Sequence, residues 1–242
     1  RDAAPVVGLA VRQLYLLAGV ADVYLETGDA SLLEALKRLW AEMVATKTQE
    51  LHNMLQGIIS SMALMVEIRD PYTAGHQQRV AQLACAIAGK MALAPERMEG
   101  LRIAALLHDV GKIRIPVSIL NRTGQLLDAE LEVIKIHPQI SYDILKNIPF
   151  PWPCARMVRE HHERLDGSGY PLGLSGDEIL LESKILSVAD ITEAKSSFRP
   201  YRPALGIEAA LSELRQHRGS LYDGDAVDAC LDLYATGPFQ FA

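Results

Sequence analysis

This chain contains histidines and aspartates in a pattern that a site for several metal ions requires. His161 and His162 are adjacent, and Asp109 directly follows His108. Imidazole and carboxylate groups together suit iron, manganese, zinc or cobalt, and a carboxylate can bridge two ions where a lone imidazole cannot. Two ions roughly 3.5 to 4 Å apart activate a water molecule and compensate the charge on phosphate oxygens. The pattern therefore predicts a metallohydrolase.

The candidate ligands come from several parts of the chain: His76, His108, Asp109, His137, His161, His162 and Asp190. Five of the seven histidines are in this set. A single histidine at the end of an apolar helix is more often a core or capping residue than a ligand, whereas an unpaired carboxylate in the apolar surroundings of Asp190 is costly. Since clustered ionisable groups usually mark functional sites, the set as a whole favours metal binding.

Helices must position these side chains. Apolar residues recur at helical spacing after His76 and predict a helix there. They are Val80, Leu83, Ile87 and Met91. His108 closes another apolar run, and Gly111 suits the end of that helix because glycine accepts the left-handed conformation. We expect His137 within a helical stretch that includes residues 131–136.

In their order along the chain, these residues resemble the motifs of the HD-GYP branch of the HD-domain phosphohydrolases. The resemblance covers residues from about 50 to 238. It implies an all-helical catalytic domain that hydrolyses the bacterial messenger cyclic di-GMP, first to linear pGpG and in some members onward to GMP. The matching segments are His108-Asp109, Gly111-Lys112, His137, His161-His162, Asp166-Gly167, Gly169-Tyr170-Pro171, Asp190 and Arg199-Pro200-Tyr201-Arg202.

The resemblance also implies a role for each residue. Asp109 would bridge two divalent ions, with iron or manganese expected first and zinc, cobalt, nickel or magnesium as alternatives. Lys112 would contact the scissile phosphate and act in catalysis together with Asp109. Tyr170, Arg199 and Arg202 would hold the substrate. The metal ligands would be His76, His108, Asp109, His137, His161, His162 and Asp190.

The chemistry of the substrate-binding residues agrees with these roles and leaves alternatives for some of them. The Lys112 ammonium can act as a point charge on phosphate, and the guanidinium groups of Arg199 and Arg202 match phosphate or a guanine edge with a planar fork. An exposed loop pair is an equal alternative for the two arginines. Tyr170 could instead be the aromatic residue of a turn, packed on the helix behind it.

Two positions depart from the family pattern. Some family members carry a glutamate four residues before the first histidine, where it supports a third ion, but this chain has Tyr72 there. A phenol with a pKa of about 10 is a weak ligand, so we expect two ions and mainly pGpG as the product. Glu193 stands one helical turn beyond Asp190, where a small polar residue can contact substrate, and an acid at this position could repel phosphate or bind a cation.

Length, charge and cysteine content exclude several classes of protein. The 242 residues are enough for one substantial domain and a short appendage, and a net charge of −6 argues against general nucleic-acid binding. The apolar run from Pro5 to Val20 is interrupted by Arg12 and Gln13, so it is neither a membrane span nor a convincing signal sequence. No Cys-x-x-Cys pair occurs, which suits a reducing cytoplasm. The cysteines are Cys85, Cys154 and Cys230.

Residues 1–47 are predicted to form a helical hairpin with a turn at Thr27-Gly28-Asp29, and they hold none of the candidate ligands. Residues 7–12 and 25–40 resemble a short fragment of the helical toroid of family 127 β-L-arabinofuranosidases. The catalytic cysteine and glutamate cluster of that family is absent, so no glycosidase activity is implied. We treat the segment as an N-terminal appendage and a candidate foreign fragment, and the absence of an initial Met agrees with a truncated start.

A different pattern begins at residue 51. Apolar residues alternate at steps of four and three, as along the seam of a coiled coil. These seam residues are Leu51, Leu55, Ile58, Met62 and Met65. They predict a connecting helix over residues 48–70, ahead of a catalytic domain at 71–242. In multidomain members of the family a helix here joins a sensor to the catalytic domain. Contact with a second copy of the chain and packing on the chain's own domain are equal alternatives for the seam.

We expect an all-α HD-domain bundle that closes with helices over residues 206–214 and 226–233, the latter capped by Asp223 or Asp225. The expected protein is a cytoplasmic, metal-dependent phosphodiesterase of cyclic di-GMP. A hydrolase of another cyclic dinucleotide or of a nucleotide is the first alternative. The second is a weakly active receptor or adaptor that binds cyclic di-GMP, or a diguanylate cyclase domain through the Gly-Tyr-Pro loop. The complete ligand set argues against a pure binder.

Overall fold

The computed structural model describes residues 4–70, 75–122, 124–196 and 206–235, together with 237, 239 and 241. Within these ranges the regular structure is helical, apart from two isolated β-bridges, so the all-α prediction is confirmed. The helices are α1 (Ala4–Thr27), α2 (Ala30–Arg69), α3 (His76–Lys90), α4 (Pro95–Leu107), η2 (Val110–Arg114), α5 (Val117–Leu120), α6 (Asp128–Ile134), α7 (His137–Leu145), α8 (Cys154–Glu160), η3 (Gly176–Glu178), α9 (Leu181–Ser196), α10 (Ile207–Gln216) and α11 (Gly224–Ala235), where η marks a 3-10 helix.

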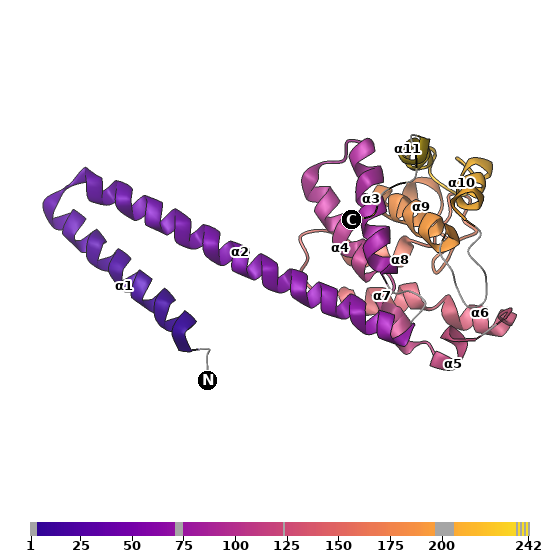
Figure 1. Ribbon diagram of the computed structural model, residues 1–242, viewed down its shortest axis with the longest axis horizontal. Coiled ribbons are helices and arrows are strands. Elements are labelled where there is room, and N and C mark those ends of the chain that lie inside the picture. The colour runs from indigo at the N-terminus through magenta and orange to yellow at the C-terminus, as the bar shows by residue number, and fades with distance from the viewer. Residues whose placement is uncertain are drawn as a thin grey trace. The chain divides into compact units, whose positions relative to one another are not determined.

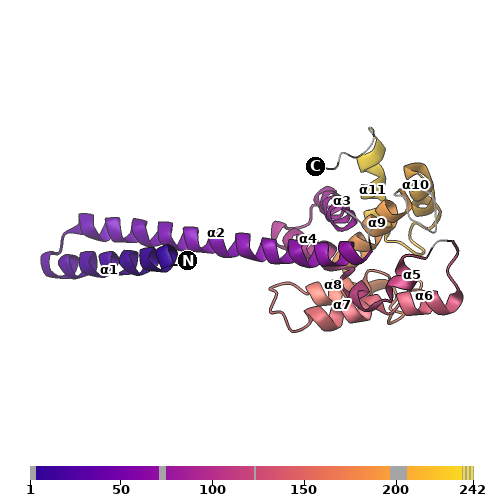
Figure 2. The ribbon, with the colours of Figure 1, turned by 60° about the horizontal axis from the view of Figure 1, so that its bottom comes forward.

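The chain folds into two compact units, residues 1–58 and 59–242. In the first unit, α1 and the first part of α2 run antiparallel as the predicted hairpin (Figures 1 and 2). The Asp29 carboxylate accepts a hydrogen bond from the Ser31 amide at 2.9 Å, which caps the start of α2. The helix then continues without a break to Arg69. The boundary predicted between residues 47 and 48 therefore falls inside α2, and it stays a prediction.

The core of the second unit is built from the buried faces of α3, α4, α8, α9 and α11. On α3 the predicted apolar face is confirmed, because Val80, Leu83 and Ile87 are fully buried. Met91, the residue after the helix, packs against the same core. α9 contacts α3, α10 and α11 (Figure 1), and most of its side chains are buried. This helix therefore carries Asp190 into the interior of the unit.

The stretch predicted as one helix around residue 137 is two helices. α6 ends at Ile134 and α7 begins at His137, with a turn of two residues between them. Pro138 lies in the first turn of α7, where the missing N–H costs no hydrogen bond. It could not have continued α6, because a proline ring clashes with the preceding helical turn. The break makes His137 the first residue of a helix.

The helices predicted to close the domain are α10 and α11. The cap of α11 is Asp223, whose Oδ1 accepts hydrogen bonds from the amides of Asp225 and Ala226 at 3.1 and 3.0 Å. Every helix in the described ranges is too short or too polar to span a bilayer.

Most of the apolar seam predicted on α2 is exposed to solvent. Leu51, Leu55, Ile58 and Met65 each leave about half of their surface accessible, between 49% and 58%. The last turns of α2 are buried through a different set of residues, Ile59, Ala63 and Val66, with Met62 partly buried against the core. Of the seam residues in the second unit, Met62 packs against the core and Met65 is exposed, so the two explanations of the seam stay predictions.

Gly111 lies where the turn after His108 packs against α7. A Cβ on Gly111 would be 2.1 Å from the carbonyl oxygen of His137 and 2.6 Å from the amide nitrogen of Ser141, both of which belong to the backbone. We expect Gly111→Ala to lower the free energy of unfolding by about 3 kcal/mol, because the backbone must move to accept the methyl group. Urea unfolding measures the change. The control, Gly57→Ala, adds its methyl group in open space and should raise the free energy of unfolding by up to about 1 kcal/mol. If both substitutions changed the free energy of unfolding by similar amounts, close packing at Gly111 would be contradicted.

Candidate metal centre

The ends of four helices and the side of a fifth bring the predicted ligands together. α3 begins at His76 and α7 begins at His137. α4 and α8 end immediately before His108 and His161, and α9 supplies Asp190 from its side. Every predicted ligand is buried except His162, which is half-buried. Residues that are far apart in the sequence therefore share one interior site.

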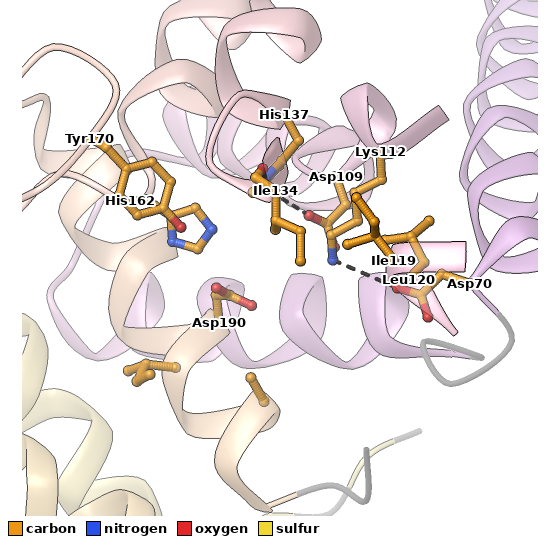
Figure 3. A pocket seen from close by; sticks show the side chains of 12 residues that line it. Asp70, Asp109, Lys112, Ile119, Leu120, Ile134, His137, His162, Tyr170 and Asp190 are labelled. Atoms are coloured by element: carbon orange, nitrogen blue, oxygen red, sulfur yellow. Dashed lines mark hydrogen bonds and ion pairs between the residues drawn. The ribbon is translucent and has the colours of Figure 1, made fainter. Parts of the chain in front are cut away.

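The donor atoms form three overlapping groups, and within each group all atoms lie within 4.8 Å of one another. The groups are His76-His108-Asp190, His108-Asp109-His161 and His137-His161-His162. Because the groups share members, all seven predicted ligands form one continuous cluster with two ends. Figure 3 shows Asp109, His137, His162 and Asp190 around the same space.

Asp109 lies between the two ends of the cluster. Its Oδ1 is 3.3 Å from Nε2 of His137, and its Oδ2 is 3.5 Å from Nε2 of His108. Two ligands of one ion, each roughly 2.0 to 2.2 Å from it, lie about 3 Å apart. Each oxygen of Asp109 can therefore share an ion with a different histidine, which is the arrangement that a bridging carboxylate requires.

Three of the histidines are held in one tautomer by the backbone. The Nδ1 of each donates to the carbonyl oxygen three residues earlier, and because a carbonyl only accepts, the proton must lie on Nδ1. The pairs are His108 with Ala105 at 2.7 Å, His137 with Ile134 at 2.8 Å and His161 with Val158 at 2.6 Å. The Nε2 atoms of these three histidines are buried and have no hydrogen-bond partner among the described residues. Buried nitrogen lone pairs that face carboxylate oxygens fit metal ligands, since a cation would satisfy both.

The protonation states of the site also suit a metal. Burial lowers the pKa of His137 to about 4 and that of His161 to about 3, and it lowers the pKa values of His108 and His162 as well. All four are therefore neutral at pH 7, which is the form that binds metal. Burial opposes the ionised form of Asp109, but the Lys112 ammonium and the neighbouring imidazoles bring its pKa well below the usual value.

Asp190 is ionised for a related reason. Burial opposes its charged form, but its interactions with His76 and with the neighbouring imidazole groups bring its pKa well below the usual value. Nε2 of His76 is 3.2 Å from Oδ1 of Asp190. The cluster thus includes four neutral imidazoles and two anionic carboxylates, a donor set that suits divalent iron, manganese or zinc.

A cavity of about 180 Å³ opens beside the cluster. Tyr170 lies against His162, with 4.8 Å between the ring centroids, and burial raises the pKa of its phenol, which therefore stays neutral. The Lys112 ammonium also faces the cavity, so two of the predicted substrate-binding residues lie where a ligand would meet the cluster. The lining residues are Asp70, Asp109, Lys112, Ile119, Leu120, Ile134, His137, His162, Tyr170, Asp190, Ile191 and Ala194.

Asp70, at the end of α2, is a cavity residue that sequence reasoning did not find. The Lys112 ammonium donates to Oδ2 of Asp109 at 2.6 Å and lies 3.9 Å from Oδ2 of Asp70 (Figure 3). The neighbouring Arg69 donates to the carbonyl of Ile115 at 3.2 Å, and Ile115 directly follows the 3-10 helix η2 that carries Lys112. The end of α2 therefore contacts the segment that carries Lys112 at two points. No local pattern marks Asp70, because its role depends on a contact across the fold.

Glu163 is a second residue that was missed, although it directly follows the paired histidines. Its carboxylate accepts hydrogen bonds from the amides of Leu172 and Leu174 at 2.7 and 3.1 Å, and so fixes the loop that follows Tyr170. Glu193, which was expected near the substrate, does not line the cavity; its carboxylate contacts His76 and Arg79 instead. Arg199, Arg202 and Tyr72 lie outside the described residues, so their roles stay predictions.

Comparisons with known proteins agree with this geometry. A family model described as HD domain matches residues 60–226. The cyclic di-GMP phosphodiesterase response regulator RpfG of Xanthomonas campestris pv. campestris is 40% identical over 197 residues, which cover 81% of this chain and 51% of that protein. The 3'3'-cGAMP-specific phosphodiesterase 3 of Vibrio cholerae serotype O1 is 40% identical over 176 residues, or 72% of this chain and 38% of that protein. This chain thus spans about half, or less, of the length of these relatives.

A solved structure gives a similar result. The cyclic GMP-AMP-specific phosphodiesterase V-cGAP3 of V. cholerae aligns with a TM-score of 0.51 and 28% identity, covering 92% of this chain and 56% of that chain.

The buried histidines determine how the metal-free protein responds to acid. Their pKa values are lowered from an unfolded value of about 6.5, so at intermediate pH the unfolded state binds more protons. The contribution of these histidines to the free energy of unfolding is complete above about pH 6.5. It is lost as the pH falls toward the folded-state pKa, which is about 4 for His137 and about 3 for His161. We expect the melting temperature of the chelator-treated protein to fall from about pH 7.5 to about pH 5. His137→Gln should flatten this dependence, and the exposed control His52→Gln should not. A melting temperature that is constant over this range would contradict neutral buried histidines.

Proposed function

This chain belongs to the HD domain family, in its HD-GYP branch, and we propose that it is a metal-dependent phosphodiesterase that hydrolyses cyclic di-GMP. The observation that carries the proposal is the buried Asp109 carboxylate, whose two oxygens face different histidines beside a cavity that also presents Lys112. This is a suitable arrangement for a substrate with an anionic phosphodiester. The predicted ligand set and substrate contacts belong to the same proposal.

The side chains of the site would have separate roles in hydrolysis. When bound, two divalent ions would supply Lewis acidity and a water nucleophile at neutral pH. Lys112 would turn its ammonium from Asp109 toward a phosphate oxygen and compensate its charge. Tyr170 and the apolar residues Ile119 and Leu120 would cover a base and limit the access of water. Arg199 and Arg202 would add planar donors for phosphate or guanine.

Two ions per chain are proposed rather than three, with iron or manganese as the metal. Tyr72 offers only a weakly ligating phenol next to the first histidine. Glu193 does not replace it in this proposal, because its two carboxylate oxygens contact His76 and Arg79. We expect pGpG as the main product, since a third ion is an aid to the second hydrolysis.

A second substrate, 3'3'-cGAMP, is favoured by one specific observation. The relative from V. cholerae that is 40% identical over 176 residues is named as specific for 3'3'-cGAMP. Incubation of the Mn²⁺-loaded protein with each dinucleotide, followed by chromatography of the products, distinguishes the two. Faster hydrolysis of cyclic di-GMP supports the proposal, and faster hydrolysis of 3'3'-cGAMP replaces its substrate. Binding of cyclic di-GMP without turnover would instead identify a receptor.

The protein is also proposed to act in the cytoplasm, where its three free cysteines would stay reduced. Its proposed partners are cyclic di-GMP, a second copy of the chain through the exposed seam on α2, and a diguanylate cyclase domain through the Gly169-Tyr170-Pro171 loop. The seam supports the second partner because exposed apolar residues at coiled-coil spacing suit a helix of the same sequence.

Turnover should depend on the charge of Asp109. Asp109→Asn keeps the shape of the side chain but removes the negative charge that would hold two cations together, so we expect activity on cyclic di-GMP to fall by about 100-fold or more. Chromatographic rates and elemental analysis of bound metal measure the effect. Asp143→Asn, an exposed aspartate paired with Lys146 on α7, is the control and should keep full activity. Undiminished hydrolysis by the Asp109 variant would exclude the two-ion mechanism.

The seam on α2 should determine the oligomeric state. Ile58→Glu places a charge in the middle of the apolar seam, and we expect it to convert a dimer into a monomer because a buried unpaired charge is costly. Light scattering coupled to size-exclusion chromatography measures the mass. Ser60→Glu adds the same charge to an exposed position off the seam and should leave the dimer intact. A wild-type chain that is monomeric at every concentration tested would refute the dimer.

A further inference from the structure

His76 is held differently from three other histidines of the cluster. Its Nδ1 contacts the Oε2 atom of Glu193, whereas Nδ1 of His108, His137 and His161 each donate to a backbone carbonyl. Its Nε2 faces the cluster, 3.2 Å from Oδ1 of Asp190. His76 therefore connects a carboxylate on its outer side with the metal-facing atoms on its inner side.

Arg79 completes this arrangement from the other side of Glu193. Its Nε donates to Oε1 of Glu193 at 2.6 Å, and its Nη2 lies 2.5 Å from the same oxygen. Glu193 is only 2% exposed, and a buried carboxylate needs such a partner to stay charged. His76 and Arg79 lie three residues apart on α3, and Asp190 and Glu193 lie three residues apart on α9. The two helices pack against each other, and each supplies two of these four residues.

A carboxylate on the outer nitrogen of a ligand histidine fixes the orientation of the ring and increases the basicity of its inner nitrogen. The group that His76 forms with His108 also contains the carboxylate of Asp190, whereas the opposite group consists of imidazoles alone: His137, His161 and His162. The His76 end of the cluster therefore has more negative charge and a more basic imidazole. Both features strengthen the binding of a divalent cation.

We infer that Glu193, held by Arg79, is a positioning residue for His76 and makes the His76-His108-Asp190 group the tighter of two metal subsites. This inference rests on the proposed metal centre and deepens it, because it assigns unequal affinities to the two ions. A purely structural role, in which Glu193 only ties α3 to α9, predicts a loss of stability without a selective loss of metal.

The test is a calorimetric titration of the chelator-treated full chain with Mn²⁺. The wild type should bind two ions with different affinities. Glu193→Gln should weaken the tighter site by about 10- to 100-fold and leave the weaker site unchanged. Arg79→Gln, at a side chain that is 32% exposed, should weaken the same site to a smaller extent and provides a second variant if Glu193→Gln does not fold.

A matched control lies on the same helix. Glu182 is also a buried carboxylate of α9 held by an arginine, Arg97, at 2.6 Å, but it lies roughly 12 Å along the helix from Asp190. Glu182→Gln should lower the melting temperature without changing either Mn²⁺ affinity. In a His76→Gln background, Glu193→Gln should have no further effect on Mn²⁺ binding, because its action passes through His76.

The outcomes separate this inference from the proposed function. Two bound Mn²⁺ ions with affinities unchanged in Glu193→Gln, or weakened equally at both sites, would overturn the inference alone. The inference would also be overturned if the effects of Glu193→Gln and His76→Gln on Mn²⁺ affinity were additive in the double variant. A wild-type chain that binds no Mn²⁺ would overturn both the inference and the proposed metal centre.

Discussion

The site depends on two buried carboxylates, Asp109 and Asp190, that are surrounded by imidazoles rather than by water. A buried carboxylate is costly unless a cation or a donor compensates it. The Lys112 ammonium compensates Asp109 at 2.6 Å, and His76 lies 3.2 Å from Asp190. The groups that stabilise these charges thus belong to the proposed catalytic machinery, so the fold and the site share the same interactions.

Helix ends lower the energetic cost of burying so many polar groups in one place. The last turn of a helix leaves carbonyl groups without an intrahelical partner, and a histidine just beyond the end can donate to one of them through Nδ1. This occurs after α4, α6 and α8, with His108, His137 and His161 as the donors. Each bond satisfies a helix end and at the same time turns a buried Nε2 lone pair toward the cluster. Binding of a metal to these lone pairs would add its free energy to that of folding.

Much of the fold and of the ligand set could be predicted from local patterns. The apolar face of α3, the turn at Gly28 and the order of the histidine and aspartate motifs depend on residues that are close in the sequence. The break between α6 and α7 was missed because apolar spacing continued across it, although Pro138 marks a helix start. For the seam on α2, spacing alone could not distinguish burial from exposure, since both give the same period.

From the sequence alone we could identify the residue types of the candidate ligands, most of the helices that carry them and the family to which the chain belongs. The grouping of the candidate ligands, the inward-facing nitrogens of His76, His108, His137 and His161, and the contacts of Glu193 became known only from the three-dimensional fold. These properties depend on partners from other helices: the Nδ1 of His76 contacts a carboxylate 117 residues away, and Lys112 lies near an aspartate at the end of α2. Helical periodicity is set by neighbours along the chain, whereas tautomers and charges are set by neighbours in space.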